Sequence, residues 1–171
     1  MEVNMANSLF KKTGDDVFSV SEGVLGRCGP RFQPFNISRL EEKHGVDVVI
    51  SLQKISKRII QAFGDVGIRH EKLFFPSGEL ENTNQRERFI NDALQPAIEI
   101  IKQERKKGNT VLVHCTAGLD RTGSVLAGWL IENRGMEPDE AIQKIKDNRE
   151  DAFITDGYEE AVFLWWAKKD I

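Results

Sequence analysis

The chain has 171 residues, with 24 lysines and arginines against 27 aspartates and glutamates, for a formal net charge of −3. With 40% hydrophobic and 30% charged residues, this composition excludes disordered, fibrous and disulfide-scaffolded proteins and predicts one globular domain. A dedicated nucleic-acid binder would carry a basic excess that this chain lacks. The two cysteines, Cys28 and Cys115, fit a reducing compartment, and no run approaches the roughly 20 apolar residues of a membrane span. We therefore expect a cytoplasmic, unanchored monomer.

The first half of the chain predicts helices and strands in alternation. We expect a loose amino-terminal segment over residues 1–14 and a single domain over residues 15–171. The pattern Ser38-x-x-Glu41 is a capping box, and Gly45 is typical of a helix end. The short run VDVVIS is β-branched and apolar, as in a buried strand. The predicted elements are a helix over residues 39–44, a strand over 46–51, a helix over 54–63 and an extended segment over 68–75.

The second half of the chain continues the alternation. Thr83 is predicted to cap a long helix that ends at Gly108 and that Pro96 kinks or divides. A strand over residues 110–114 follows, and then helices over 122–134, from Pro138, and over 157–169, where Trp165 and Trp166 are expected to pack. Strands joined by crossover helices favour an α/β fold with a central, mostly parallel sheet flanked by helices.

The most informative stretch is HCTAGLDRTG, residues 114–123, between a predicted strand and a predicted helix. Such a loop presents consecutive backbone N–H groups and the positive end of a helix dipole to one point, which suits a phosphate dianion. The same field stabilises a thiolate, so Cys115 is a candidate nucleophile. Arg121 can give a phosphate two parallel hydrogen bonds. The predicted phosphate site comprises Thr116, Ala117, Gly118, Leu119, Asp120 and Arg121.

Three further residues of this stretch have expected roles beside the nucleophile. Gly118 allows the backbone turn that lets the amides converge. The Thr122 hydroxyl is expected within reach of the Cys115 sulfur, where it would stabilise the thiolate as a leaving group. His114, at the strand end, is expected to orient the loop from behind rather than to titrate in catalysis.

The stretch resembles the H-C-x-A-G-x-x-R-[ST]-G signature loop of the cysteine-dependent protein tyrosine phosphatase superfamily. The surroundings, from about residue 18 to residue 166, look most like the compact dual-specificity class, with FFPSGE in the middle and NRED-x-FITDGYEEAVFLWW near the end. The resemblance implies hydrolysis of phosphate monoesters through a phosphocysteine intermediate, with no metal and no cofactor. The expected partner is a phosphorylated substrate, either a phosphoprotein or a phosphorylated small molecule.

The general acid is where the sequence departs from the family pattern. The usual Asp after the segment that corresponds to residues 68–75 is absent, and the chain offers Glu79 and Glu81 there. Asp120 resembles the D-R-T ending of the myotubularin and Sac-type phosphoinositide phosphatases. We rank Asp120 ahead of Glu79 because the loop holds it relative to the phosphate. The alternative is that Asp120 only caps the following helix or pairs with a cation.

Two substrate classes stay open: a dual-specificity or tyrosine-type protein phosphatase, and a phosphatase of inositol phosphates, phosphoinositides or RNA 5′-phosphates. A non-catalytic phosphate-binding module is a weaker alternative. Arg27, Cys28 and Arg31, in GRCGPR, are interpreted as a surface turn, with Cys28 as a redox partner of Cys115 the functional alternative. The strand-end rule places a basic cluster, Lys54, Lys57 and Arg58, at the same sheet edge as Cys115, where it would bind extra substrate phosphates. The alternative is that these residues form the solvated charged face of a helix.

Overall fold

A computed structural model describes residues 16–169, so the segment predicted to be loose, residues 1–14, lies outside the described part. A five-stranded sheet with the strand order β1-β2-β5-β3-β4 forms its centre. The strands are β1 (Phe18–Ser21), β2 (Val24–Arg27), β3 (Val46–Ser51), β4 (Arg69–Lys72) and β5 (Thr110–His114). The helices are α2 (Ile37–Glu42), α3 (Lys57–Asp65), α4 (Thr83–Phe89), the π-helix η1 (Ile90–Leu94), α5 (Gln95–Lys106), α6 (Arg121–Arg134), α7 (Pro138–Asn148) and α8 (Tyr158–Lys169).

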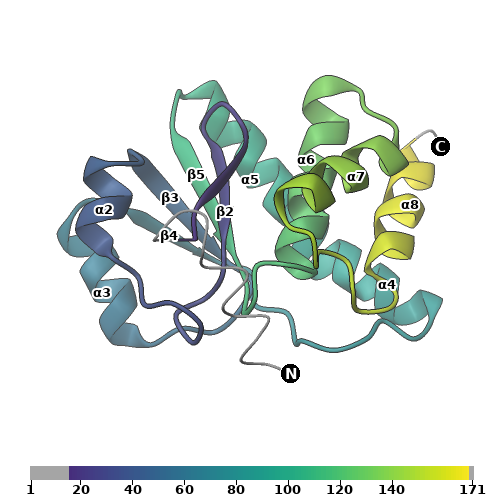
Figure 1. Ribbon diagram of the computed structural model, residues 1–171, viewed down its shortest axis with the longest axis horizontal. Coiled ribbons are helices and arrows are strands. Elements are labelled where there is room, and N and C mark those ends of the chain that lie inside the picture. Colours follow the sequence, from purple (N-terminus) through teal and green to yellow (C-terminus); the bar gives the residue numbers. More distant parts are fainter. Residues whose placement is uncertain (1–15, 170–171) are drawn as a thin grey trace.

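The sheet is parallel except for β1, which pairs antiparallel with β2 at the edge. Helices α2 and α3 cover one face and the group from α4 to α8 covers the other, as Figure 1 shows. Residues of β5 alternate between the two cores: Val111 and Val113 join the core on the α4–α8 side, and Leu112 joins the other. Trp165 is buried in the larger core, and Trp166 packs against it, as expected. The predicted α/β fold with a mostly parallel sheet is confirmed.

The predicted strands over residues 46–51 and 110–114 are confirmed, but some helix starts differ. Asn36, not Ser38, caps α2, since its side chain accepts a hydrogen bond from Arg39 N at 3.1 Å. The capping box predicted at Ser38 is therefore wrong. Helix α3 begins at Lys57 after Ser56 as N-cap, three residues later than predicted. The strands β1 and β2 are an addition to the predicted elements.

The long helix predicted after Thr83 is divided, as Pro96 suggested. Its N-cap is Asn82, whose side chain accepts from Gln85 N at 2.9 Å, so Thr83 is the first helical residue. Pro96 lacks an N–H and its ring would clash with the Asp92 carbonyl in an α-helix. Asp92 lies in the wider π-helical turn, η1, directly before α5. The proline thus separates α4 from α5 without ending the helical run.

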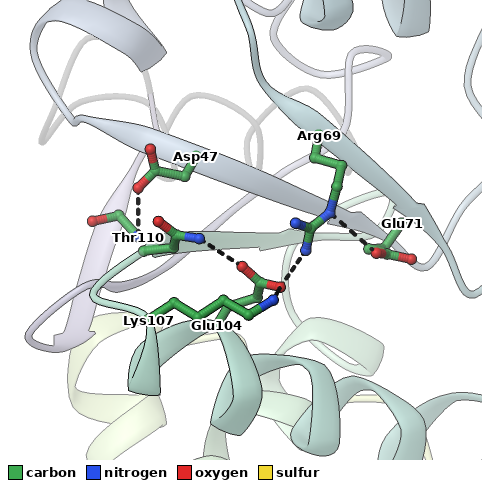
Figure 2. A network of polar contacts seen from close by, with 7 residues as sticks. Asp47, Arg69, Glu71, Glu104, Lys107 and Thr110 are labelled. Atoms are coloured by element: carbon green, nitrogen blue, oxygen red, sulfur yellow. Dashed lines mark hydrogen bonds and ion pairs between the residues drawn. The ribbon is translucent and has the colours of Figure 1, made fainter.

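A polar network ties together the amino ends of the parallel strands (Figure 2). The buried Glu104 carboxylate accepts from Asn109 Nδ2 at 2.8 Å and pairs with Arg69 at the start of β4. Asp47 of β3 accepts from the Thr110 backbone N–H of β5 at 2.8 Å. The hydrogen bonds from Asn109 and Arg69 keep the pKa of Glu104 below its ordinary value. This network lies at the sheet edge opposite to the carboxyl ends of the strands.

Within the part of the chain that the structure describes, no helix has the length and apolar character needed to cross a bilayer.

Candidate active site

The loop from β5 to α6 lies at the carboxyl end of the central strand, between β2 and β3. Gly118 has a left-handed φ of +73°, and a Cβ at this position would lie 2.6 Å from the Arg27 carbonyl oxygen. The loop is also joined to the end of β2 by a hydrogen bond from Gly29 N to Thr116 O at 2.8 Å. Glycine is therefore needed at position 118 for both its backbone angle and its close approach to β2.

The loop leaves its hydrogen-bond donors available to a ligand. Among the described residues, none of the backbone N–H groups from Thr116 to Asp120 donates to a backbone carbonyl. Helix α6 begins directly afterwards, so its positive dipole end faces the same region. A hollow of about 140 Å³ is lined by Cys115, Thr116, Ala117, Asp120 and Arg121, with further residues from two other loops and from the first turn of α8. A tetrahedral dianion in this hollow would meet amide donors with the Cys115 thiol beside it.

The Arg121 guanidinium is held in one orientation by three acceptors. Its Nη1 donates to the carbonyl oxygens of Phe75, at 2.5 Å, and Leu52, at 3.2 Å, while Nη2 donates to Thr116 Oγ1 at 2.9 Å. Only 5% of Arg121 is exposed, yet it lines the hollow beside Cys115. These bonds connect the loops after β3 and β4 to the signature loop, so the cation is oriented before any ligand binds.

His114 supports the loop from the sheet side. Its Nδ1 must carry hydrogen, because it donates to the Cys115 carbonyl oxygen at 3.1 Å. Its Nε2 therefore accepts from the Ser51 hydroxyl at 2.5 Å, and Ser51 Oγ accepts in turn from His70 Nε2 at 2.7 Å. Complete burial lowers the pKa of His114 to about 3. His114 is thus neutral at physiological pH.

The structure separates the candidate acids. Asp120 lines the hollow with Cys115, and its Oδ1 accepts from Thr155 N at 3.3 Å. Burial raises the pKa of Asp120 above its ordinary value, although Thr155 and Arg121 oppose the shift. The Asp120 side chain makes no capping hydrogen bond to α6. Glu79 and Glu81 are exposed and are not among the residues that line the hollow.

The Thr122 hydroxyl differs from its expected arrangement. It is buried and makes no hydrogen bond with any described residue, so the predicted contact with the Cys115 sulfur is not formed in this structure. Thr122 lies in the first turn of α6, where its backbone position is set by the helix.

Arg27 and Cys28 are buried, so the surface turn predicted for them is wrong. Arg27 ends β2, and its guanidinium lies 4.2 Å from the centroid of the Phe35 ring and donates to Gln33 O at 2.8 Å. Cys28 is fully buried, and burial together with the neighbouring Asp16 raises the pKa of its thiol to about 12. A thiol that ionises so weakly is poorly suited to attack an oxidised Cys115.

The sequence prediction missed four residues that line the hollow: Ser77, Gly78, Thr155 and Tyr158. Tyr158, at the start of α8, donates from its hydroxyl to Gly78 O at 2.9 Å and is nearly fully buried. Burial raises the pKa of Tyr158 to about 12, so the phenol stays protonated. The segments FFPSGE and FITDGYEEAVFLWW, already quoted for the family resemblance, contain all four and were the available signal.

A second hollow of about 570 Å³ adjoins the first. It is lined by Arg31, Gln53, Lys54, Phe74, Phe75 and Pro76, and it shares Ser77, Thr116 and Arg121 with the smaller hollow. Arg31 follows β2, Gln53 and Lys54 follow β3, and Phe74 follows β4, so the carboxyl ends of three parallel strands build it. Lys57 and Arg58, which the strand-end rule also placed here, are exposed on α3 and do not line it.

Comparison with known proteins agrees with this geometry. The family model for the dual specificity phosphatase catalytic domain matches residues 34–167. Dual specificity protein phosphatase CDC14B of Mus musculus is 29% identical over 148 residues, which are 77% of this chain and 27% of that protein. An RNA/RNP complex-1-interacting phosphatase homolog of Caenorhabditis elegans is 26% identical over 107 residues, which are 63% of this chain and 45% of that protein.

The chain therefore spans less than half the length of these two relatives. Among solved structures, that of PTPMT1 in complex with PI(5)P has a TM-score of 0.67 and 19% identity, with 90% of this chain and 98% of that chain covered. This likeness concerns the fold. The family match, in contrast, extends over most of the chain and includes the loop that holds Cys115 and Arg121. The chain accordingly belongs to the dual-specificity phosphatase family.

Proposed function

We propose that the protein hydrolyses phosphate monoesters of phosphoproteins through a covalent intermediate on Cys115. The observation that carries the proposal is that Cys115 and the oriented Arg121 guanidinium line one small hollow at the start of α6. In the first step, Cys115 Sγ attacks phosphorus, the bond from phosphorus to the leaving oxygen breaks, and an acid protonates that oxygen. In the second step, water attacks phosphorus, gives a proton to the same acid, and the bond from phosphorus to sulfur breaks.

Arg121 and the loop amides are the groups that hold the phosphoryl oxygens. The guanidinium would bind two oxygens in parallel, a geometry that a lysine ammonium cannot reproduce. The bonds from Arg121 to Leu52 O and Phe75 O support this role, because an oriented donor loses little entropy when the transition state forms.

Asp120 is our proposed general acid. Its position in the hollow beside Cys115 and its raised pKa both favour a protonated carboxyl group that can donate its proton to the leaving oxygen. Glu79, in contrast, is exposed and does not line the hollow. Thr122 is proposed to stabilise the departing thiolate after a small rotation of its unpaired hydroxyl, and His114 to position the loop.

A phosphoprotein substrate is supported by the charge and shape of the surface around the hollow. In the signature loop Arg121 supplies the only positive charge, which is less than a densely phosphorylated inositol ring requires. The larger hollow offers an apolar wall of Phe74 and Pro76, which suits a polypeptide with mixed side chains. The alternative of a non-protein ester is favoured by the Asp120-Arg121-Thr122 ending and by relatives named for RNA complexes.

The experiment compares kcat/KM for phosphopeptides with kcat/KM for inositol phosphates, phosphoinositides and RNA 5′-phosphates. Higher values for phosphopeptides are expected, and higher values for any non-protein ester contradict the substrate class. Cys115→Ser should abolish turnover yet keep affinity for phosphate analogues, because the loop amides remain. Turnover within about tenfold of wild type in that variant would exclude the phosphocysteine intermediate.

A further inference from the structure

We propose that the larger hollow binds a second anionic side chain of the same phosphopeptide, so that the protein prefers a phosphoresidue followed closely by a second phosphate or a carboxylate. We call this hollow, lined by Arg31, Gln53, Lys54 and Phe74–Ser77, the cation groove. The inference rests on the proposed function, since it names the peptides that the same site selects.

The cation groove is continuous with the phosphate site. Ser77, Thr116 and Arg121 line both hollows, so a ligand whose phosphate lies beside Cys115 leaves its flanking atoms at the mouth of the groove. The volume of about 570 Å³, against about 140 Å³ for the phosphate site, leaves room for a neighbouring residue with its side chain.

The charges of the groove are of one sign. Arg31 and Lys54 are both exposed, and within residues 16–169 neither forms an ion pair or a side-chain hydrogen bond. Among the described residues, those that line the groove include no aspartate or glutamate. On the far side of the shared residues, in contrast, the smaller hollow contains Asp120. An anionic group therefore gains most by lying toward β3 and β4. A phosphate is favoured over a carboxylate because it carries more negative charge opposite Arg31 and Lys54.

The apolar wall indicates what connects the two anions. Phe74 is 36% exposed and lies on the groove wall with Pro76, although large apolar side chains are usually buried. An aromatic ring beside the two cations suits the backbone and β-carbons of a peptide that crosses it.

Binding is measured in the Cys115→Ser protein, so that the peptides are not consumed. Three peptides of one sequence each carry one phosphotyrosine, with alanine, glutamate or phosphoserine two residues after it. One exposed ion pair changes an affinity by roughly twofold to fivefold, so two pairs give about tenfold. We expect the doubly phosphorylated peptide to bind about tenfold more tightly than the alanine peptide, with the glutamate peptide between them.

The preference should disappear in Arg31→Gln/Lys54→Gln and persist in Lys57→Gln, which removes an equally exposed charge from the same neighbourhood. Equal dissociation constants for the three peptides, or an equal loss in Lys57→Gln, overturns the inference. Wild-type protein that hydrolyses phosphopeptides while the binding shows no preference leaves the proposed function standing and removes only the cation groove. Wild-type protein that hydrolyses non-protein esters but no phosphopeptide overturns both.

Discussion

Replacement of Asp120 by asparagine removes one proton from the site while it conserves the shape of the side chain. The amide oxygen of Asn can still accept the hydrogen bond that Thr155 N gives to Asp120 Oδ1 at 3.3 Å, so the loop from α7 to α8 should stay in place. The lost property is the ability to protonate the leaving oxygen. Any rate change therefore reports on acid catalysis rather than on misfolding.

The expected loss in kcat is roughly 10²–10⁴-fold for an alkyl phosphate, the usual contribution of a positioned acid. A loss of about 1000-fold corresponds to about 4 kcal/mol of transition-state stabilisation. Because burial raises the pKa of Asp120 above its ordinary value of 3.8, its protonated form persists to a higher pH than that of an exposed aspartate. In the wild type the rate should fall as pH rises through this pKa, and the same limb should be flat in Asp120→Asn.

The assay compares two leaving groups in wild type, Asp120→Asn and Glu79→Gln. A nitrophenolate leaves without a proton, so the defect of Asp120→Asn should shrink for para-nitrophenyl phosphate and stay large for the alkyl ester. Glu79→Gln should be near wild type on both, since Glu79 is exposed and outside the hollow. A large, leaving-group-dependent loss in Glu79→Gln, with Asp120→Asn nearly unaffected, would refute the assignment.

Three other predictions follow from the same contacts. Arg121→Lys should lower both phosphate-analogue affinity and kcat despite its conserved charge, because the fork is lost; unchanged kinetics would mean that Arg121 is structural. Gly118→Ala should destabilise the protein in urea unfolding by more than the roughly 1–2 kcal/mol expected for Gly45→Ala, which shares a left-handed φ but has open space around it. Glu104→Gln should lower the unfolding free energy by about 1–2 kcal/mol, and Glu71→Gln, which changes a half-buried side chain, by under about 0.5 kcal/mol. The pKa of Glu104 is lower in the folded protein than its unfolded value of 4.5. The stability that ionised Glu104 contributes is therefore complete above pH 4.5 and is lost as the pH falls through the folded pKa. A loss of stability in Glu104→Gln that is equal at pH 7 and pH 3 would contradict this.

Local signals were sufficient for the central part of the fold and for the signature loop. The strands over residues 46–51 and 110–114 are buried on both faces, so their apolar runs are visible without knowledge of their neighbours. Pro96 could be interpreted alone because its missing N–H acts within its own helix. The spacing of Cys115, Gly118 and Arg121 likewise indicates an anion-binding loop, because those residues lie within one short loop.

Only the tertiary structure decided features that depend on contacts between distant segments. Arg27 is buried because β2 pairs with β5 and because Phe35 lies against its guanidinium. The local sequence of a four-residue strand predicts neither contact. Asp120 and Glu79 are both carboxylic residues, and the sequence alone does not show which one is buried. The packing of the loop before α8 encloses Asp120 and leaves Glu79 in solvent. The cation groove forms because β2, β3 and β4 end at the same edge of the sheet and the loops that follow them meet there. Sequence spacing determines chemistry within a loop, whereas burial and the meeting of loops depend on how the whole chain packs.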